Sequence, residues 1–239
     1  MTSLNGAIVL VTGANGGIGT HFVREALARG AAKVYATART PRTWDDERIV
    51  PLALDVTDPA SIQAVAEAAS DVTVLINNAG ISVPSAGLLS HSDEEIRASV
   101  ETNFLGPLFL TRAFAPLLAA KQGGTAIINL HSALSWYAVA GIYSATKAAL
   151  WSSTNSLRLE LQPAGVKVVG VHVGWVDTAM AAHVTDDKVD PAELVGQVFD
   201  ATEAGEHEVL ADVTSVHAKA GLSAPLEAVY PQLATAQQA

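Results

Sequence analysis

Short runs of aliphatic and β-branched residues alternate along the chain with longer, alanine-rich stretches of helical period. The short runs predict strands, and the longer stretches predict helices. The predicted strands cover residues 7–11, 33–38, 50–54, 73–76, 125–130, 166–173 and 208–211. The predicted helices cover residues 17–29, 59–69, 93–121, 143–161 and 191–204. The longest of these helices is expected to break near Gly106 and Pro107, since both residue types disfavour a helix interior.

The predicted strands are almost continuously apolar and do not alternate between apolar and polar residues. Such strands are typical of a parallel sheet that helices cover on both faces. The sequence therefore predicts one α/β domain over residues 1–239, a doubly wound Rossmann-type fold with a mostly parallel sheet of about seven strands flanked by helices. The alanine- and glutamine-rich tail after Leu233 is expected to fray.

The composition excludes several classes of function. Acidic residues outnumber basic ones 24 to 14, so the net charge of -10 gives no electrostatic basis for binding nucleic acid or an anionic membrane. The chain has no cysteine, which excludes disulfides, thiol catalysis and thiolate metal sites, and no metal site is predicted. No apolar stretch is long enough to span a bilayer, and no signal peptide is recognisable, so a cytoplasmic location is expected.

A glycine-rich turn, TGANGGIG at residues 12–19, follows the first predicted strand and opens the first predicted helix. Glycine lets the backbone approach a pyrophosphate closely, and a helix N-terminus offers free N–H groups to it. The order of strand, turn and helix favours a dinucleotide site over a purely structural turn. The candidate cofactor ligands in this turn are Gly13, Asn15, Gly17, Ile18 and Gly19.

Arg39 stands at the end of the second predicted strand, where an NAD-binding protein usually has an acidic residue. A guanidinium group suits a 2′-phosphate, so the sequence predicts a preference for NADP(H), with NAD(H) as the alternative. The alternative interpretation is that Arg39 is a solvated surface charge without a role in cofactor binding. Asp55, followed by Val56, ends the third predicted strand and is placed either to accept a hydrogen bond from the adenine amino group or to cap a turn.

Tyr143 and Lys147 lie four residues apart at the start of a predicted helix and therefore share one of its faces. A neighbouring ammonium group favours a phenolate, so the pair can make tyrosine an acid or base near neutral pH. By itself this spacing is weak support, because it occurs by chance on many helices. Ser132 follows the fifth predicted strand and brings a hydroxyl to the carboxyl edge of the sheet, where ligands bind in this architecture.

Six motifs in order resemble the classical short-chain dehydrogenase/reductase family, over about the first three quarters of the chain. They are TGANGGIG at 12–19, NNAG at 77–80, Asn103, Ser132, Tyr143 with Lys147, and GWVDT at 174–178. The resemblance implies that Tyr143 is the general acid in reduction and that Ser132 hydrogen-bonds the substrate oxygen. It also implies that Lys147 binds the nicotinamide ribose and lowers the tyrosine pKa.

The remaining motif residues have roles by resemblance too. Asn103 would hold a water that links Lys147 to solvent. The segment 77–80 would support the sheet and cover the adenosine side, and the segment 174–178 would hold the carboxamide. The cofactor residues implied there are Asn78, Ala79, Gly80, Gly174, Val176 and Thr178. Each asparagine and Ser132 also has a structural alternative, as a helix polar residue, a turn former or a strand-end cap.

The chain departs from the family pattern at three places. Val173 stands where proline is common before Gly174, which leaves that turn less rigid. His131 precedes Ser132 where a small or β-branched residue is common, and we expect it to pack in the interior or support the site from behind. The C-terminal Val-Asp-Gly-Gly of many tetrameric members is missing and a helical tail follows instead, so the homodimer or homotetramer that the resemblance implies is open.

The substrate pocket is expected after Ser132, after the segment 77–80 and after Thr178. Its candidates are Val83, Ser132, Trp136, Tyr137, Met180 and His183. They favour an apolar or aromatic ketone or aldehyde, because basic residues are scarce in these segments. Alternatively, Trp136 and Met180 are part of the hydrophobic core. Residues 179–190 are expected to form a mobile lid.

The leading hypothesis is an NADPH-dependent carbonyl reductase that also runs in reverse, with a small-molecule carbonyl or alcohol as its substrate. One alternative is an NAD-dependent alcohol dehydrogenase of the same fold. Another is a non-catalytic binding protein that senses NADP(H). The intact set of Ser132, Tyr143 and Lys147 argues against the sensor, which needs no proton donor at the nicotinamide.

Overall fold

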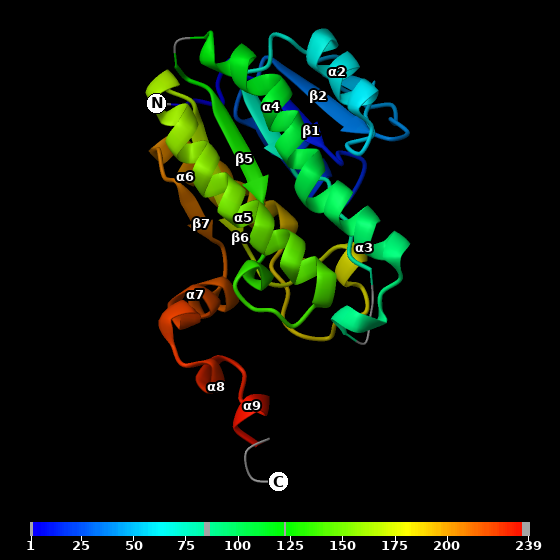
Figure 1. Cartoon of the computed structure of the whole chain (residues 1–239). Helices are drawn as coiled ribbons and strands as arrows, with labels where there is room; N and C mark the ends of the chain where they lie inside the picture. Colours follow the sequence, from blue (N-terminus) through cyan, green and yellow to red (C-terminus); the bar gives the residue numbers. More distant parts are fainter. Residues whose placement is uncertain (1, 84–86, 122, 236–239) are drawn as a thin grey trace.

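The computed structural model describes residues 2–83, 87–121 and 123–235. Within them the chain forms a seven-stranded sheet in the order β3-β2-β1-β4-β5-β6-β7 (Figure 1). The strands are β1 (Ile8–Thr12), β2 (Lys33–Ala38), β3 (Ile49–Ala53), β4 (Val74–Asn77), β5 (Ala126–Leu130), β6 (Lys167–His172) and β7 (Glu208–Leu210). Neighbouring strands run parallel throughout this order, so the predicted fold class is confirmed.

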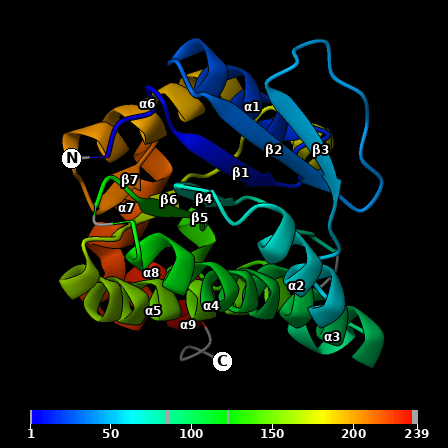
Figure 2. The same cartoon turned by 90° about the horizontal axis from the view of Figure 1, so that it is seen from above.

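Helices cover both faces of the sheet (Figure 2). One face carries α1 (Gly17–Ala28) and α6 (Pro191–Ala204), and the other carries α2 (Pro59–Ala68), α4 (Gly106–Ala119) and α5 (Gly141–Leu161). A shorter helix, α3 (Asp93–Val100), precedes α4. After β7 the chain continues as α7 (Val213–Ala220), α8 (Leu226–Val229) and α9 (Gln232–Thr235), which lie beyond the main body in Figure 1.

The central strands are apolar along their whole length because both of their faces are buried. Successive side chains of a strand point to opposite faces. Accordingly Val9 and Val11 of β1 pack in the core beneath α1 and α6, whereas Leu10 packs in the core beneath α2, α4 and α5. The edge-to-face contact of Phe22 with Phe199, at 5.5 Å between ring centres, joins α1 to α6. The two cores together sandwich the sheet.

The long helical region breaks where the sequence predicted. Residues Glu101–Leu105 form a π-helix between α3 and α4, and α4 begins at Gly106 directly before Pro107. A Cβ atom at Gly106 would lie 3.0 Å from the carbonyl oxygen of Val56, so this close approach needs glycine. The other predicted boundaries agree with the structure to within two residues. The tail also differs, since α9 continues past Leu233 to Thr235, and residues 236–239 lie outside the described ones.

None of the helices in the described ranges combines the length and the apolarity that crossing a membrane requires.

Leu110 and Leu159 test the placement of the core. Leu110 of α4 is fully buried, so Leu110→Ala is expected to lower the free energy of unfolding by about 2–5 kcal/mol through lost apolar burial and the cavity that remains. Leu159→Ala removes the same atoms from α5, where Leu159 is 73% exposed, and should change that free energy by less than about 0.5 kcal/mol. Urea unfolding measures both, and equal losses would contradict this assignment of the core.

Candidate active site

The glycine-rich turn joins β1 to α1 at the carboxyl edge of the sheet. Gly13 and Gly17 adopt positive φ angles of 66° and 50°, which favour glycine. A Cβ atom at Gly19 would lie 2.2 Å from the carbonyl oxygen of Gly13, so no side chain fits there. Gly19 therefore lets α1 pack closely against the turn, while Gly16 and Gly17 are exposed and leave the N-terminus of α1 open to a ligand.

Hydrogen bonds tie this turn to the segment after β4. The hydroxyl oxygen of Thr12 accepts from the backbone N–H groups of Asn78 and Ala79, both at 2.9 Å. The Asn78 side chain donates to the carbonyl oxygen of Thr12 at 2.7 Å. The Asn78 side chain thus braces two neighbouring strand ends, which agrees with the supporting role that the resemblance implied for residues 77–80.

The adenosine end of the candidate site lies at the ends of β2 and β3. Hydrogen bonds from the backbone N–H and the hydroxyl of Thr57 lower the pKa of Asp55. The charge of Arg39, which is exposed, acts in the same direction. Asp55 accepts from the Thr57 N–H at 2.9 Å and therefore caps a turn. Asn15 donates to the carbonyl oxygen of Thr40 at 2.7 Å, while its Oδ1 is buried with no hydrogen-bond partner among the described residues.

Lys147 is buried at the other end of the candidate site. Its Nζ donates to the carbonyl oxygen of Leu130 at 2.7 Å and lies 5.6 Å from the ring centre of Tyr143. Burial lowers the pKa of Lys147 to about 8, because a low-dielectric interior disfavours the charged form. The ammonium group is thus held one helical turn from the phenol, at the end of β5.

The Ser132 hydroxyl lies close enough to the Tyr143 phenol to act on its pKa. Burial raises the pKa of Tyr143 to about 12, and the Ser132 hydroxyl acts in the opposite direction. The pKa of Tyr143 in the chain alone is therefore raised, whereas the resemblance implied that Lys147 lowers it. At neutral pH Tyr143 is therefore protonated, as a proton donor must be.

The π-helix places Asn103 next to this pair. Asn103 is 1% exposed and exchanges two hydrogen bonds of 2.8 Å with the backbone of Ile81. A Cβ atom at Gly80 would lie 3.3 Å from Asn103 Oδ1 and 3.9 Å from Lys147 Nζ. Gly80 thus lets the asparagine and the lysine approach each other, and the inserted residue of a π-helix commonly marks such a functional position.

The segment after β6 closes the set of predicted cofactor residues. The backbone N–H of Gly174 donates to the Asp212 carboxylate at 2.8 Å, and Val176 pairs with Val189 in an isolated parallel bridge. The Thr178 methyl group lies 3.4 Å from where a Cβ atom of Gly17 would be, so this segment reaches the glycine-rich turn. The structure therefore brings both segments together.

The predicted substrate residues are placed less uniformly. Trp136 is 8% exposed and stacks on His172 with ring centres 3.8 Å apart, so its ring lies in the interior, as its alternative allowed. Met180 is 47% exposed. His183 is also exposed, and its ring meets the edge of Trp175. Val83 is half-buried beside residues 84–86, which lie outside the described ones.

One residue of this region was missed by the sequence analysis. Tyr230, after α8, stacks on Tyr137 with ring centres 5.3 Å apart, and its hydroxyl accepts from the backbone N–H of Ala138 at 3.0 Å. The only signal in the sequence was an aromatic residue in an alanine-rich tail. The C-terminal segment thus contacts the loop that joins Ser132 to Tyr143.

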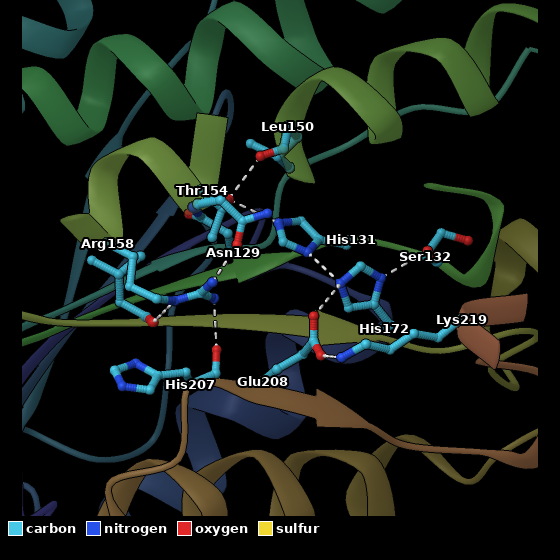
Figure 3. A network of polar contacts seen from close by, with 12 residues as sticks. Asn129, His131, Ser132, Leu150, Thr154, Arg158, His172, His207, Glu208 and Lys219 are labelled. Carbon is cyan, nitrogen blue, oxygen red and sulfur yellow. Dashed lines mark hydrogen bonds and ion pairs between the residues drawn. The ribbon is translucent and has the colours of Figure 1, made fainter. Parts of the chain in front are cut away.

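His131 packs in the interior, as the sequence analysis expected. It is 4% exposed and takes part in a buried network with His172 and Thr154 (Figure 3).

Comparisons with known proteins show a family and several similar structures. The sequence profile of a family described as short chain dehydrogenase matches residues 7–189. The NADP-dependent 3-hydroxy acid dehydrogenase of Schizosaccharomyces pombe is 29% identical over 241 residues, covering 89% of this chain and 93% of that protein. A short chain dehydrogenase from Burkholderia cenocepacia J2315, solved in complex with NADP, is 36% identical with a TM-score of 0.90, covering 97% of this chain and 99% of that one. The NADPH-bound carbonyl reductase from chicken fatty liver is 31% identical with a TM-score of 0.76, covering 83% and 87%.

The buried charge of Lys147 predicts a pH-dependent contribution to stability. Its pKa in the folded chain, about 8, lies below the ordinary lysine value of 10.5, so the unfolded chain binds more protons between these pH values. The free energy of unfolding of the wild type, relative to Lys147→Met, should therefore rise between pH 8 and 10.5 by an amount on the order of 3 kcal/mol. Urea unfolding of both proteins across this range measures the difference. Parallel pH dependences would contradict the burial of the charge.

Proposed function

Because the chain belongs to the short chain dehydrogenase family, as its six motifs indicated, we propose that it is an NADPH-dependent carbonyl reductase. It converts a ketone or aldehyde to the alcohol, and it runs in reverse when NADP+ and alcohol are in excess. The observation that carries the proposal is the place of the Tyr143 phenol, whose ring centre lies 5.6 Å from the buried Nζ of Lys147 and whose pKa the nearby Ser132 hydroxyl acts on.

The residues at the glycine-rich turn fit a dinucleotide. The exposed backbone at Gly16 and Gly17, directly before and at the start of α1, is open to a pyrophosphate, and Asn15 beside it has an Oδ1 without a hydrogen-bond partner among the described residues. Arg39, with no acidic residue at the end of β2, supports NADP(H) over NAD(H). Val176 and Thr178 would hold the nicotinamide end, and the bound cofactor supplies the hydride.

Ser132 after β5 and Tyr143 of α5 then supply a hydrogen bond and the proton. Reduction of a carbonyl carbon leaves negative charge on its oxygen, which needs hydrogen-bond donors and a proton source. The Ser132 hydroxyl donates to this oxygen, and the Tyr143 hydroxyl donates to it and transfers its proton. The ammonium group of Lys147 stabilises the phenolate that Tyr143 becomes. The carbonyl carbon gains the hydride, the oxygen gains the proton, and the alcohol leaves.

The substrate is an apolar ketone or aldehyde. Tyr137, with Tyr230 stacked on it, offers an aromatic wall beside the proton donors, and Met180 offers an exposed apolar side chain. Residues 179–190 form the lid over this space, held at its base by the bridge between Val176 and Val189.

The assay that tests the proposal follows absorbance at 340 nm with NADPH or NADH and a panel of aliphatic, aromatic and bicyclic ketones. Consumption of NADPH with one class of ketone supports the reductase. A preference for NADH would favour the NAD-dependent alcohol dehydrogenase instead. Tight NADPH binding with no turnover across the panel would favour the sensing protein and overturn the proposal.

Tyr143→Phe removes the proton donor alone. We expect kcat to fall by about 100- to 10,000-fold, because general acid catalysis contributes on this scale. The affinity for NADPH, measured by fluorescence titration, should stay within a few-fold of the wild type. Near-normal turnover in this variant would exclude Tyr143 as the acid.

Arg39→Asp is expected to reverse the cofactor preference, because it exchanges a partner of the 2′-phosphate for a partner of the ribose 2′-hydroxyl. The ratio of kcat/KM for NADPH to that for NADH should fall below one. Arg42→Asp makes the same change of charge three residues away, where Arg42 stacks on Trp44 at 3.9 Å, and should keep the preference. If both variants change the ratio equally, the general field of the surface and not a specific contact sets it.

A further inference from the structure

Two histidines lie side by side in the interior and take no part in the reaction proposed above. His131 directly follows β5 and is 4% exposed, and His172 ends β6 and is fully buried. Nδ1 of His131 lies 3.0 Å from Nε2 of His172 (Figure 3). The chain makes room for this pair, because a Cβ atom at Gly170 would lie 2.7 Å from the His131 ring.

The partners at the two ends of the pair fix where its protons lie. Nδ1 of His172 is 3.1 Å from the backbone carbonyl oxygen of Ser132, which only accepts, so His172 must carry its proton on Nδ1. In a neutral ring Nε2 is then an acceptor, and Nδ1 of His131 must donate to it. Nε2 of His131 accepts in turn, from the Thr154 hydroxyl at 2.9 Å.

Both rings are neutral near pH 7. Burial lowers the pKa of His172 to about 3 and lowers that of His131 well below its usual value. The positive charges of Lys147 and Arg158 also lower the pKa of both rings. The Glu208 carboxylate lies 3.7 Å from Nε2 of His172, but it binds the Lys219 ammonium group. The neutral arrangement is therefore the one that satisfies every ring nitrogen.

The same direction of donation continues behind the pair. Asn77 donates to Oδ1 of Asn129 at 2.8 Å, and Asn129 donates to the Thr154 hydroxyl at 2.9 Å. Thr154 Oγ1 also lies 2.7 Å from the carbonyl oxygen of Leu150, but its single proton serves one acceptor at a time. If that proton went to Leu150, both histidines would have to adopt the other tautomer, with the proton on Nε2. Nδ1 of His172, which faces the Ser132 carbonyl oxygen, would then lack a proton.

The network ends on the peptide that carries the candidate hydroxyl. The Ser132 carbonyl oxygen accepts a hydrogen bond from Nδ1–H of His172, and it accepts a second one from the backbone N–H of Ser135 at 3.0 Å. Trp136 stacks on the opposite side of the His172 ring and covers it. His172 therefore joins the end of β6 to the corner where Ser132 turns toward Tyr143.

We propose that His172 is a positioning residue for the reduction, which orients Ser132 through its backbone carbonyl, and that His131 fixes the tautomer of His172. The proposal rests on the function proposed above for Ser132. Its distinctive consequence is that both rings carry their single proton on Nδ1.

The tautomers can be read in the wild-type protein without any turnover. Two-dimensional ¹⁵N–¹H NMR of the ring nitrogens is expected to give the Nδ1–H form for both His131 and His172 near pH 7. An Nε2–H form of His172, or a charged ring, would overturn the proposal. This measurement does not depend on whether the chain reduces any ketone.

Two substitutions at His172 separate positioning from packing. In His172→Asn the amide nitrogen takes the place of Nδ1, so the bond to the Ser132 carbonyl is kept and the contact with His131 is lost. His172→Gln places its amide near Nε2, so the contact with His131 is kept and the bond to Ser132 is lost. Both variants lose the ring that Trp136 stacks on, and each is therefore a control for the other.

We expect the two variants to differ in kcat by more than any difference in their melting temperatures explains. His172→Asn should keep kcat within about threefold of the wild type, whereas His172→Gln should lower it about 10- to 100-fold with an unchanged KM for NADPH, as expected for a displaced proton donor. Equal kcat values in the two variants, or losses that follow their melting temperatures, would overturn the role of His172. Absence of turnover in the wild type would instead contradict the proposed function.

Discussion

The buried ammonium group of Lys147 is the constraint on which the arrangement of the site depends. A charge in the interior is costly unless strong acceptors surround it, and the carbonyl oxygen of Leu130 is held 2.7 Å away for this purpose. This contact fixes α5 against the end of β5. Because Tyr143 lies one turn earlier on the same helix, it is fixed beside Ser132 at the same time. Gly80 and the π-helix that carries Asn103 complete the surroundings.

Polar side chains inside the apolar layers extend this constraint across the sheet. Asn77 of β4, Asn129 of β5 and Thr154 of α5 are at most 2% exposed and hydrogen-bond one another. Isolated polar groups at such depth would be destabilising, so each depends on its neighbour for a partner. The strand register and the position of α5 are thereby coupled, because a shift of either element would leave several buried groups without partners.

The sequence predicted those parts that local chemistry determines. Continuous apolar strands gave the parallel sheet, and the glycine-rich turn and the spacing of Tyr143 and Lys147 placed the candidate site at its edge. Contacts between distant segments were beyond such patterns. Tyr230 is 92 residues from its partner Ala138, and His172 is 41 from His131, so neither pairing has a local signal. The stacking of Trp136 on His172 belongs to the same class, which is why Trp136 was assigned to the substrate pocket.

The two ends of the site are built from separate parts of the chain. In the function proposed here, the adenosine end is assigned to the turn after β1 and to Arg39 after β2, whereas the candidate hydrogen-bond and proton donors depend on β5, α5 and the end of β6. The loop from Ser132 to Tyr143 is held on one side by His172 and on the other by Tyr230 of the C-terminal segment. Changes in that segment can therefore alter the substrate space without disturbing the glycine-rich turn. Such a division lets one fold keep its cofactor while its substrate changes.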